Sequence, residues 1–222
     1  MQSHSKTSAV KQAVSIPASG SVLSGDLAVP PNALGLVLFA HGSGSSRHSP
    51  RNKAVAAKLN EMHLGTLLMD LLTAEEEVID EQTSALRFDI PMLTDRLVEI
   101  VDWLIVNPAT EGMKLGIFGA STGAASAIGA AARRGKWVNA VVSRGGRPDL
   151  AKDYLSELEA PTLLIVGGQD YTVIELNKLA FAGMTCVKKL SIIEGATHLF
   201  SEPGALEQVS VETGEWFQKY LR

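Results

Sequence analysis

The sequence predicts an α/β fold with a mostly parallel central sheet flanked by helices. Short, continuous apolar runs alternate along the 222 residues with segments whose apolar residues recur at helical spacing. Continuous apolar runs are typical of parallel strands, because both faces of such strands are covered. Gly, Ser, Asp and His residues also follow directly after several of these runs. Ligands of open α/β sheets bind beyond the carboxyl ends of the strands, so we expect the functional site there.

Composition favours a single domain that handles small molecules. A hydrophobic content of 45% allows a large core, and we expect one domain over residues 1–222, with residues 1–9 as a flexible tail. The formal charge of −4 and the scattered Lys and Arg argue against binding to nucleic acid or to an anionic membrane surface. A monomer or homodimer acting on a small, neutral or weakly polar substrate fits these features best.

The sequence also predicts a cytoplasmic location. Residues 1–12 are polar and lack the apolar centre of a signal peptide, and no apolar run approaches the roughly 20 residues that cross a bilayer. The single cysteine, Cys186, cannot form an intrachain disulfide, so nothing indicates an oxidising compartment.

The expected elements follow from periodicity and from turn residues. Alternation on either side of Pro17-Ala18-Ser19-Gly20 predicts an antiparallel hairpin at one edge of the sheet. Strands are expected at 10–16, 22–29, 34–40, 65–72, 137–142 and 190–194, with two more that begin at Leu115 and Pro161. Helices are expected at 53–62, after Thr73, from Pro91 to Leu104, after Gly123 and from 204 to 221.

The helix after Thr73 begins with a capping-box pattern, Thr73-Ala74-Glu75-Glu76. We interpret the acidic triplet 75–77 as a solvated helical face that the helix dipole favours. No His or Cys pairs occur at metal-ligand spacing, so we expect no metal site and no cofactor.

The segment Leu115–Gly123 joins an apolar run to an alanine-rich helical pattern without a linker. Its sequence fits a strand, a sharp turn and a helix, which is the context of a nucleophile elbow. Such a turn holds the central residue in a strained conformation, and Gly119 and Gly123 remove side chains that would collide where strand and helix pack. Ser121 is therefore the candidate nucleophile.

Asp170 and His198 are the candidate partners of Ser121. A serine hydroxyl is a poor nucleophile by itself, so a histidine must take its proton and an acid must orient the histidine. Asp170 follows the strand that begins at Pro161, and His198 follows the last strand, which gives the order Ser, Asp, His. Asp149 is the competing acid, but its Pro-Asp-Leu setting is typical of a helix start.

The other histidines are weaker candidates for a catalytic base. His4 lies in the expected tail, and His48 lies in a loop. His63 comes at a helix end, and His41 is expected to brace the loop that it begins.

The loop His41–Ser46 is rich in glycine and serine and follows an early strand. Backbone amides in such a loop stabilise the oxyanion that forms during acyl transfer. We expect the first oxyanion donor at Ser43, with Gly44 as the alternative, and the second at the amide of Thr122, directly after the nucleophile. The competing interpretation is an ordinary strand-to-helix connection.

Three residues are candidate substrate contacts. Gly44 lies in the loop just described, and Arg144 and Arg147 lie in the expected loop 143–149, beyond the strand 137–142. An arginine at this position can bind a carboxylate or carbonyl oxygen of the substrate, or it can simply brace the loop.

Four motifs together carry a resemblance to a known family. Leu-Phe-Ala-His-Gly-Ser-Gly, Gly-Ala-Ser-Thr-Gly, Gly-Gly-Gln-Asp and Gly-Ala-Thr-His resemble those of the α/β-hydrolase superfamily, with a spacing similar to the small, lidless dienelactone hydrolase family. The resemblance covers about residues 10–221 and implies an α/β-hydrolase fold without a lid domain. Dienelactone hydrolases proper use a cysteine nucleophile where this chain has Ser121. The resemblance therefore implies hydrolysis of carboxylic esters through an acyl-enzyme on Ser121, rather than of dienelactone.

The segment between Ser121 and Gly168 has room for only a helix, a strand, a helix and a strand, so we expect an open site for small, accessible esters. Ser121, Asp170 and His198 would also suit a lactone hydrolase, an acyltransferase or a perhydrolase. A non-catalytic binding module is the alternative from another class. The segment Arg-Gly-Gly-Arg-Pro-Asp, residues 144–149, also resembles hydrolase domains fused to phosphoribosyltransferases, but the length of this chain predicts no such fused partner.

Overall fold

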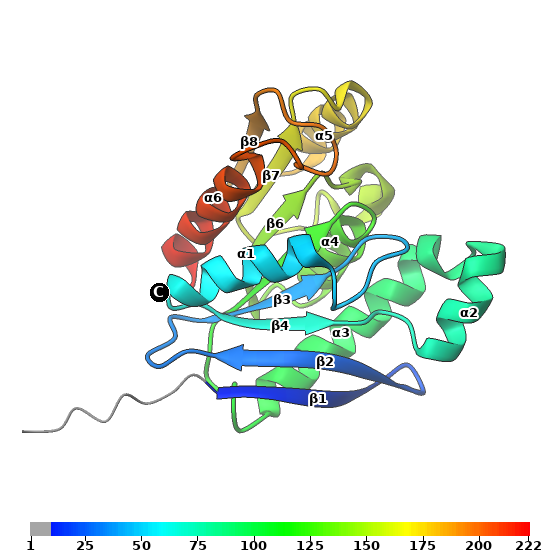
Figure 1. Ribbon diagram of the computed structural model, residues 1–222, viewed down its shortest axis with the longest axis vertical. Coiled ribbons are helices and arrows are strands. Elements are labelled where there is room, and N and C mark those ends of the chain that lie inside the picture. The colour runs from blue at the N-terminus through cyan, green and yellow to red at the C-terminus, as the bar shows by residue number, and fades with distance from the viewer. Residues whose placement is uncertain (1–9) are drawn as a thin grey trace, which may run out of the picture.

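The computed structural model describes residues 10–222, which form eight strands and six α-helices (Figure 1). The tail predicted over residues 1–9, with His4, lies outside the described residues. The strands are β1 (Val10–Ala18), β2 (Ser21–Val29), β3 (Leu36–Ala40), β4 (Gly65–Met69), β5 (Leu115–Ala120), β6 (Val138–Arg144), β7 (Thr162–Gly167) and β8 (Lys188–Ile193). The helices are α1 (Pro50–Glu61), α2 (Ala74–Thr83), α3 (Ile90–Val106), α4 (Gly123–Arg133), α5 (Tyr171–Gly183) and α6 (Ala205–Tyr220), with 3₁₀ segments η1 (Leu86–Phe88) and η2 (Pro148–Tyr154).

The strands form one sheet in the order β1-β2-β4-β3-β5-β6-β7-β8. The hairpin β1–β2 is antiparallel and joins β4 in antiparallel pairing, whereas β3 to β8 pair in parallel. Ser19 and Gly20 at the hairpin turn both have positive φ, 51° and 75°, which suits the twist of a tight hairpin. The predicted sheet and edge hairpin are therefore confirmed.

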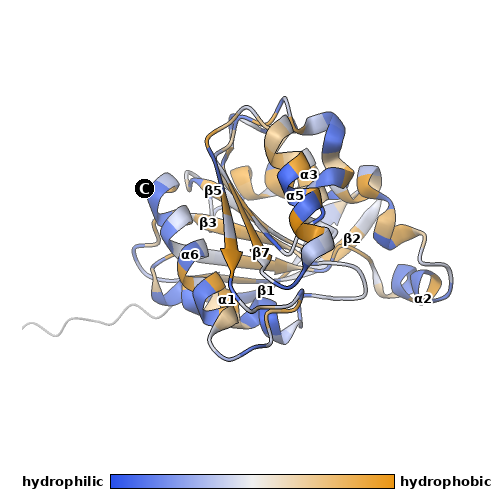
Figure 2. Cartoon of the chain, turned by 90° about the horizontal axis from the view of Figure 1, so that it is seen from above, coloured by the Kyte–Doolittle hydropathy of each residue, from blue (hydrophilic) through white to orange (hydrophobic). Residues whose placement is uncertain are grey.

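Helices cover both faces of the sheet. One face packs against α1 and α6, and the other packs against α3, α4 and α5 (Figures 1 and 2). Along β3, Leu36 and Leu38 enter the core under α3 and α4, while Val37 and Phe39 enter the core under α1 and α6. Both alternating sets are buried, which explains the uninterrupted apolar run.

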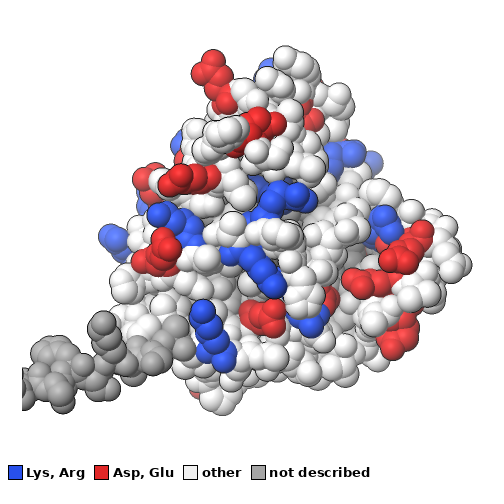
Figure 3. Space-filling model, viewed as in Figure 1, with Lys and Arg blue, Asp and Glu red and all other residues white. Residues whose placement is uncertain are grey.

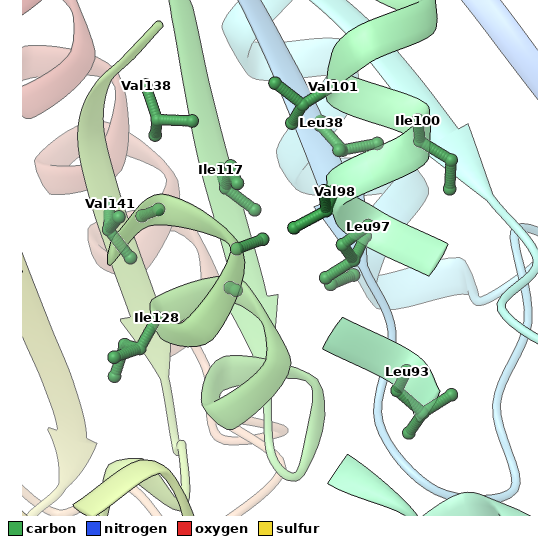
Figure 4. Close-up of a cluster of buried hydrophobic side chains, with 14 of the residues drawn as sticks. Leu38, Leu93, Leu97, Val98, Ile100, Val101, Ile117, Ile128, Val138 and Val141 are labelled. Atoms are coloured by element: carbon green, nitrogen blue, oxygen red, sulfur yellow. The ribbon is translucent and has the colours of Figure 1, made fainter. Parts of the chain in front are cut away.

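Figure 4 shows part of the larger core. Leu97, Val98 and Val101 of α3 lie beside Leu38 of β3 and Ile117 of β5. These α3 residues recur at helical spacing, so the helix buries one face against the sheet. This packing holds β5, and with it the turn that follows β5, in place against β3 and α3.

Only α4, β6, η2 and β7 lie between Ser121 and Gly168, which matches the predicted helix, strand, helix and strand. Helix α5, over residues 171–183, was not among the predicted elements. The chain contains no extra domain within its described part, and α2 projects beside the sheet at the right of Figure 1.

Thr73 caps α2 as predicted, with both bonds of the capping box present. The interpretation of residues 75–77 as a purely solvated face is wrong for Glu76, which accepts two hydrogen bonds, at 2.5 and 2.7 Å, from the buried guanidinium of Arg96. Arg96 also donates to the carbonyl of Leu71. The acidic residue therefore ties α2 to α3, a long-range pairing that local sequence does not show.

Within residues 10–222, no helix combines the length and the apolar character needed to span a bilayer. Positive and negative side chains are interspersed over the face shown in Figure 3.

Candidate active site

The carboxyl ends of the parallel strands bring the predicted site residues to one edge of the sheet. Ser121 directly follows β5, and Arg144 is the last residue of β6. Asp170 follows β7 at the start of α5, and His198 lies in the loop after β8. Residues up to 77 positions apart are therefore assembled by strand order rather than by local sequence.

Ser121 has the backbone conformation that the elbow prediction requires. Its φ is +51°, a left-handed value that non-glycine residues rarely adopt. A Cβ added at Gly119 would overlap the backbone of Ala124, and one added at Gly123 would overlap the carbonyl oxygen of His41. The two glycines are thus required because strand, turn and helix approach too closely for any side chain.

Asp170 lies beside His198. Its Oδ2 is 2.6 Å from the ring Nδ1, and the two side chains are 15% and 40% exposed. A carboxylate at Nδ1 favours the tautomer that leaves Nε2 without a proton and able to accept one. The competing acid, Asp149, accepts two hydrogen bonds of 2.8 Å from Arg147 instead.

Ser121 and His198 line the same cleft, whose volume is about 220 Å³. Gly42 lies against the serine, since a Cβ there would come within 2.8 Å of the Ser121 Cβ. No hydrogen bond joins Ser121 Oγ to the His198 ring in the described structure. In unliganded enzymes such bonds are commonly long and shorten when substrate binds.

The two expected oxyanion donors are placed differently. Over the described residues, the amide of Thr122 donates to no protein acceptor. It is therefore free to donate to an oxyanion, as this role requires. The amide of Ser43 donates to Thr122 Oγ1 at 3.0 Å, and the two hydroxyl oxygens are 2.9 Å apart. The Ser43 amide is therefore already used within the protein. Gly44, the alternative, has φ +64° in the same turn.

His41 braces its loop, as expected. Its Nδ1 lies 2.9 Å from the carbonyl oxygen of Gly42, and its Nε2 accepts a hydrogen bond of 3.0 Å from the amide of Leu71. This arrangement requires a neutral ring. Burial lowers the pKa of His41 below its usual 6.5, and this outweighs the Gly42 hydrogen bond and the nearby Asp70 charge, which both raise it.

The two candidate substrate-binding arginines have different surroundings. Arg144 belongs to β6 rather than to the predicted loop; its side chain lines the cleft with Ser121 and is only 8% exposed. Arg147 is bound by Asp149 and does not line that cleft. Contact of Arg147 with a substrate stays a prediction.

Sequence reasoning missed the contribution of α1. Arg51 and Asn52, in its first turn, line the cleft with Ser121. The predicted helix began at Lys53, whereas α1 begins at Pro50 with Ser49 as N-cap. A serine N-cap followed by proline is a helix-start signal, and reading it would have placed Arg51 in the first turn.

A second pocket, also about 220 Å³, lies on the other side of the 41–46 loop. It is lined by Ser43, Gly44 and Thr122, and by residues of the β4–α3 connection that include Glu77 and Asp80. Within residues 10–222, no group of three or more His, Cys, Asp or Glu side chains is arranged to hold a metal ion.

The sheet order, the elbow and the acid–histidine pair define an α/β-hydrolase. The model of the dienelactone hydrolase family matches residues 30–220, and the chain belongs to this family. The structure is similar to that of a dienelactone hydrolase from Anabaena variabilis, with 55% identity, a TM-score of 0.94 and coverage of 96% of this chain and 99% of that one.

More distant structures share the fold. Est1E from Butyrivibrio proteoclasticus has 18% identity and a TM-score of 0.77, with coverage of 93% and 98% of the two chains. Two Mycobacterium tuberculosis proteins, provisionally named phosphoribosyl transferases, are 50% identical over 208 residues. The match covers 94% of this chain, which spans about half the length, 46%, of those relatives.

The elbow packing predicts that Gly119→Ala destabilises the protein by about 1–3 kcal/mol, because the new methyl group meets backbone that cannot rotate away. Urea unfolding measures this cost. Gly135→Ala is the matched control, since its Cβ would have no neighbour closer than 3.6 Å, and we expect a change within about 0.5 kcal/mol. Equal unfolding midpoints for the two variants would contradict the packing argument.

The neutral His41 predicts acid sensitivity. Its pKa is lower in the folded protein, so below about pH 6.5 the unfolded chain takes up a proton that the folded one does not. Stability should therefore fall as the pH drops from 7.5 to 5.5, by up to about 1.4 kcal/mol per pH unit from this group. Urea unfolding at both pH values, compared with His41→Gln, isolates the effect. The same pH dependence in both proteins would refute it.

Proposed function

We propose that the protein is a serine hydrolase that cleaves carboxylic esters of small, accessible substrates through an acyl-enzyme on Ser121. The observation that carries the proposal is the Asp170–His198 pair, at 2.6 Å, on the same cleft as a serine held at φ +51°. Membership of the dienelactone hydrolase family supports hydrolysis as the reaction class.

The proposed reaction has two halves. His198 Nε2 takes the proton of Ser121 as Oγ bonds to the ester carbon, and Asp170 stabilises the charged ring. The carbonyl oxygen becomes an oxyanion that accepts a hydrogen bond from the amide of Thr122. The carbon–oxygen bond to the alcohol then breaks, and the alcohol leaves with the proton from His198. Water, deprotonated by His198, then attacks the acyl carbon. The bond from this carbon to Ser121 Oγ breaks, Oγ takes the proton back from His198, and the acid leaves.

The preference for small esters rests on the openness of the site. Only α4, β6, η2 and β7 lie between Ser121 and Gly168, so no inserted domain of that segment covers the cleft. His198 itself is 40% exposed on its side chain. Lactone hydrolysis and transfer to another alcohol or to peroxide would pass through the same acyl-enzyme, and they differ only in the substrate ring or in the second nucleophile.

We assign the transferase name of the mycobacterial relatives to the part of their length outside the match. The matched segment is the one that the dienelactone hydrolase family model covers here. The Anabaena variabilis dienelactone hydrolase is similar over 99% of its own chain, and its name is that of a hydrolase. Transferase activity is therefore no part of the proposal for this chain.

The proposal predicts an acyl burst with 4-nitrophenyl acetate that Ser121→Ala abolishes, because the acyl-enzyme can no longer form. Stopped-flow absorbance measures the burst. Asp170→Asn should keep the nucleophile but lower turnover by roughly 10⁴, as loss of the correct tautomer does in serine proteases. Asp149→Asn is the matched control, since Asp149 pairs with Arg147 and not with His198. Turnover retained by Ser121→Ala with its fold intact would overturn the proposal.

A further inference from the structure

Two arginines on the Ser121 cleft lack the carboxylate partners that most arginines of the described residues have. Within the described residues, six arginines form ion pairs with carboxylates, namely Arg47, Arg87, Arg96, Arg133, Arg134 and Arg147. Arg51 and Arg144 form none, although both line the cleft. Their Nε atoms are buried without a hydrogen-bond partner, and so is Nη1 of Arg144.

This arrangement is costly for the protein alone. Arg144 is only 8% exposed, and a buried charge without a partner is unfavourable. Burial, followed by repulsion from Arg51, lowers the pKa of Arg144 to about 10. The face of the Phe200 ring lies 6.0 Å from the Arg144 guanidinium, which compensates only in part. An anion between the two guanidinium groups would offset both the cost of burying the Arg144 charge and its repulsion from Arg51.

The first turn of α1 adds to the same positive field. Ser49 and Asn52 line the cleft beside Arg51, so the amino end of this 12-residue helix faces the site. The amide of Arg51 donates to no described acceptor, and helix amino ends favour negative charge. Two guanidinium groups and a helix terminus are best neutralised by a group with two negative charges and several oxygens.

The pocket on the other side of the 41–46 loop has the opposite character. Glu77, Asp80 and Glu81 contribute to its lining, and of these Asp80 is bound by Arg87. An anionic part of a substrate would therefore be directed away from this pocket and toward Arg51 and Arg144. Even with Arg87 in its lining, this pocket carries more acidic than basic side chains, whereas Arg51 and Arg144 line the Ser121 cleft.

We infer that Arg51, Arg144 and the amino end of α1 form a subsite for a phosphate-type dianionic group of the substrate, next to Ser121. This inference rests on the proposed ester hydrolysis for the identity of the reaction, but the binding of the anion does not. The substrate would be an ester that carries a phosphate group within reach of the two arginines.

Binding is tested on Ser121→Ala, which removes catalysis. At constant ionic strength, millimolar inorganic phosphate or sulfate should raise the Tm by at least about 3 °C at tenfold excess over its Kd. Adding Arg144→Met, or the half-buried Arg51→Met, should abolish the shift. Adding Arg133→Met is the matched control, because Arg133 lies outside the cleft, and it should leave the Tm shift unchanged. Comparison with this control separates binding at the subsite from the general stabilising effect of sulfate.

Acetate, a monoanion, separates the two kinds of anion. A shift with phosphate and sulfate but not with acetate supports the subsite. An equal or larger shift with acetate overturns the phosphate assignment in favour of a carboxylate, and no shift with any anion overturns the subsite altogether.

Activity gives an independent reading. Phosphate should inhibit hydrolysis of 4-nitrophenyl acetate competitively, with a Ki at least about tenfold higher in Arg51→Met than in the wild type. An unchanged Ki contradicts the inference. If the wild type hydrolyses no ester while phosphate still stabilises Ser121→Ala through the two arginines, the proposed function fails and the anion subsite stands.

Discussion

The close contact of β5, α4 and the end of β3 is the constraint on which the site depends. Gly119 and Gly123 allow two backbones to approach without intervening side chains, and the turn between them forces Ser121 to φ +51°. Ser121 is thereby half-buried and lines the cleft at the edge of the sheet, while its neighbours Ala120 and Thr122 are buried. The core under α3 and α4 supports this geometry, because Ile117 of β5 and Ile128 of α4 are both buried in it.

The charged side chains around Ser121 differ in whether they have a partner within the protein. Asp170 holds the His198 ring by a contact of 2.6 Å, and Arg147 forms an ion pair with Asp149. Arg51 and Arg144 form no ion pair, although both line the cleft and have buried Nε atoms without a hydrogen-bond partner. This unpaired positive charge is the basis of the anion subsite that we propose. The proposed subsite differs from the sequence-based expectation of a neutral or weakly polar substrate.

The sequence predicted the features that depend on local pattern. The edge hairpin follows from alternation around a turn, and the other six strands and the elbow follow from apolar runs and glycine placement, because these signals lie within a few neighbouring residues. The Asp170–His198 pair was also predicted, because each residue directly follows a parallel strand. Two other pairings between distant residues were not predicted, since Glu76 with Arg96 and Ser43 with Thr122 depend on how loops meet after the sheet has formed. Arg51 was missed because the start of α1 was placed three residues late, which left its first turn in the loop.

The most direct test of the central claim is a crystal structure of the protein after reaction with a fluorophosphonate. The account predicts phosphorus bonded to Ser121 Oγ, a phosphonyl oxygen accepting from the amide of Thr122, and His198 Nε2 within hydrogen-bond distance of Ser121 Oγ. A label on any other residue, or a His198 ring that stays beyond reach of the labelled serine, would contradict it.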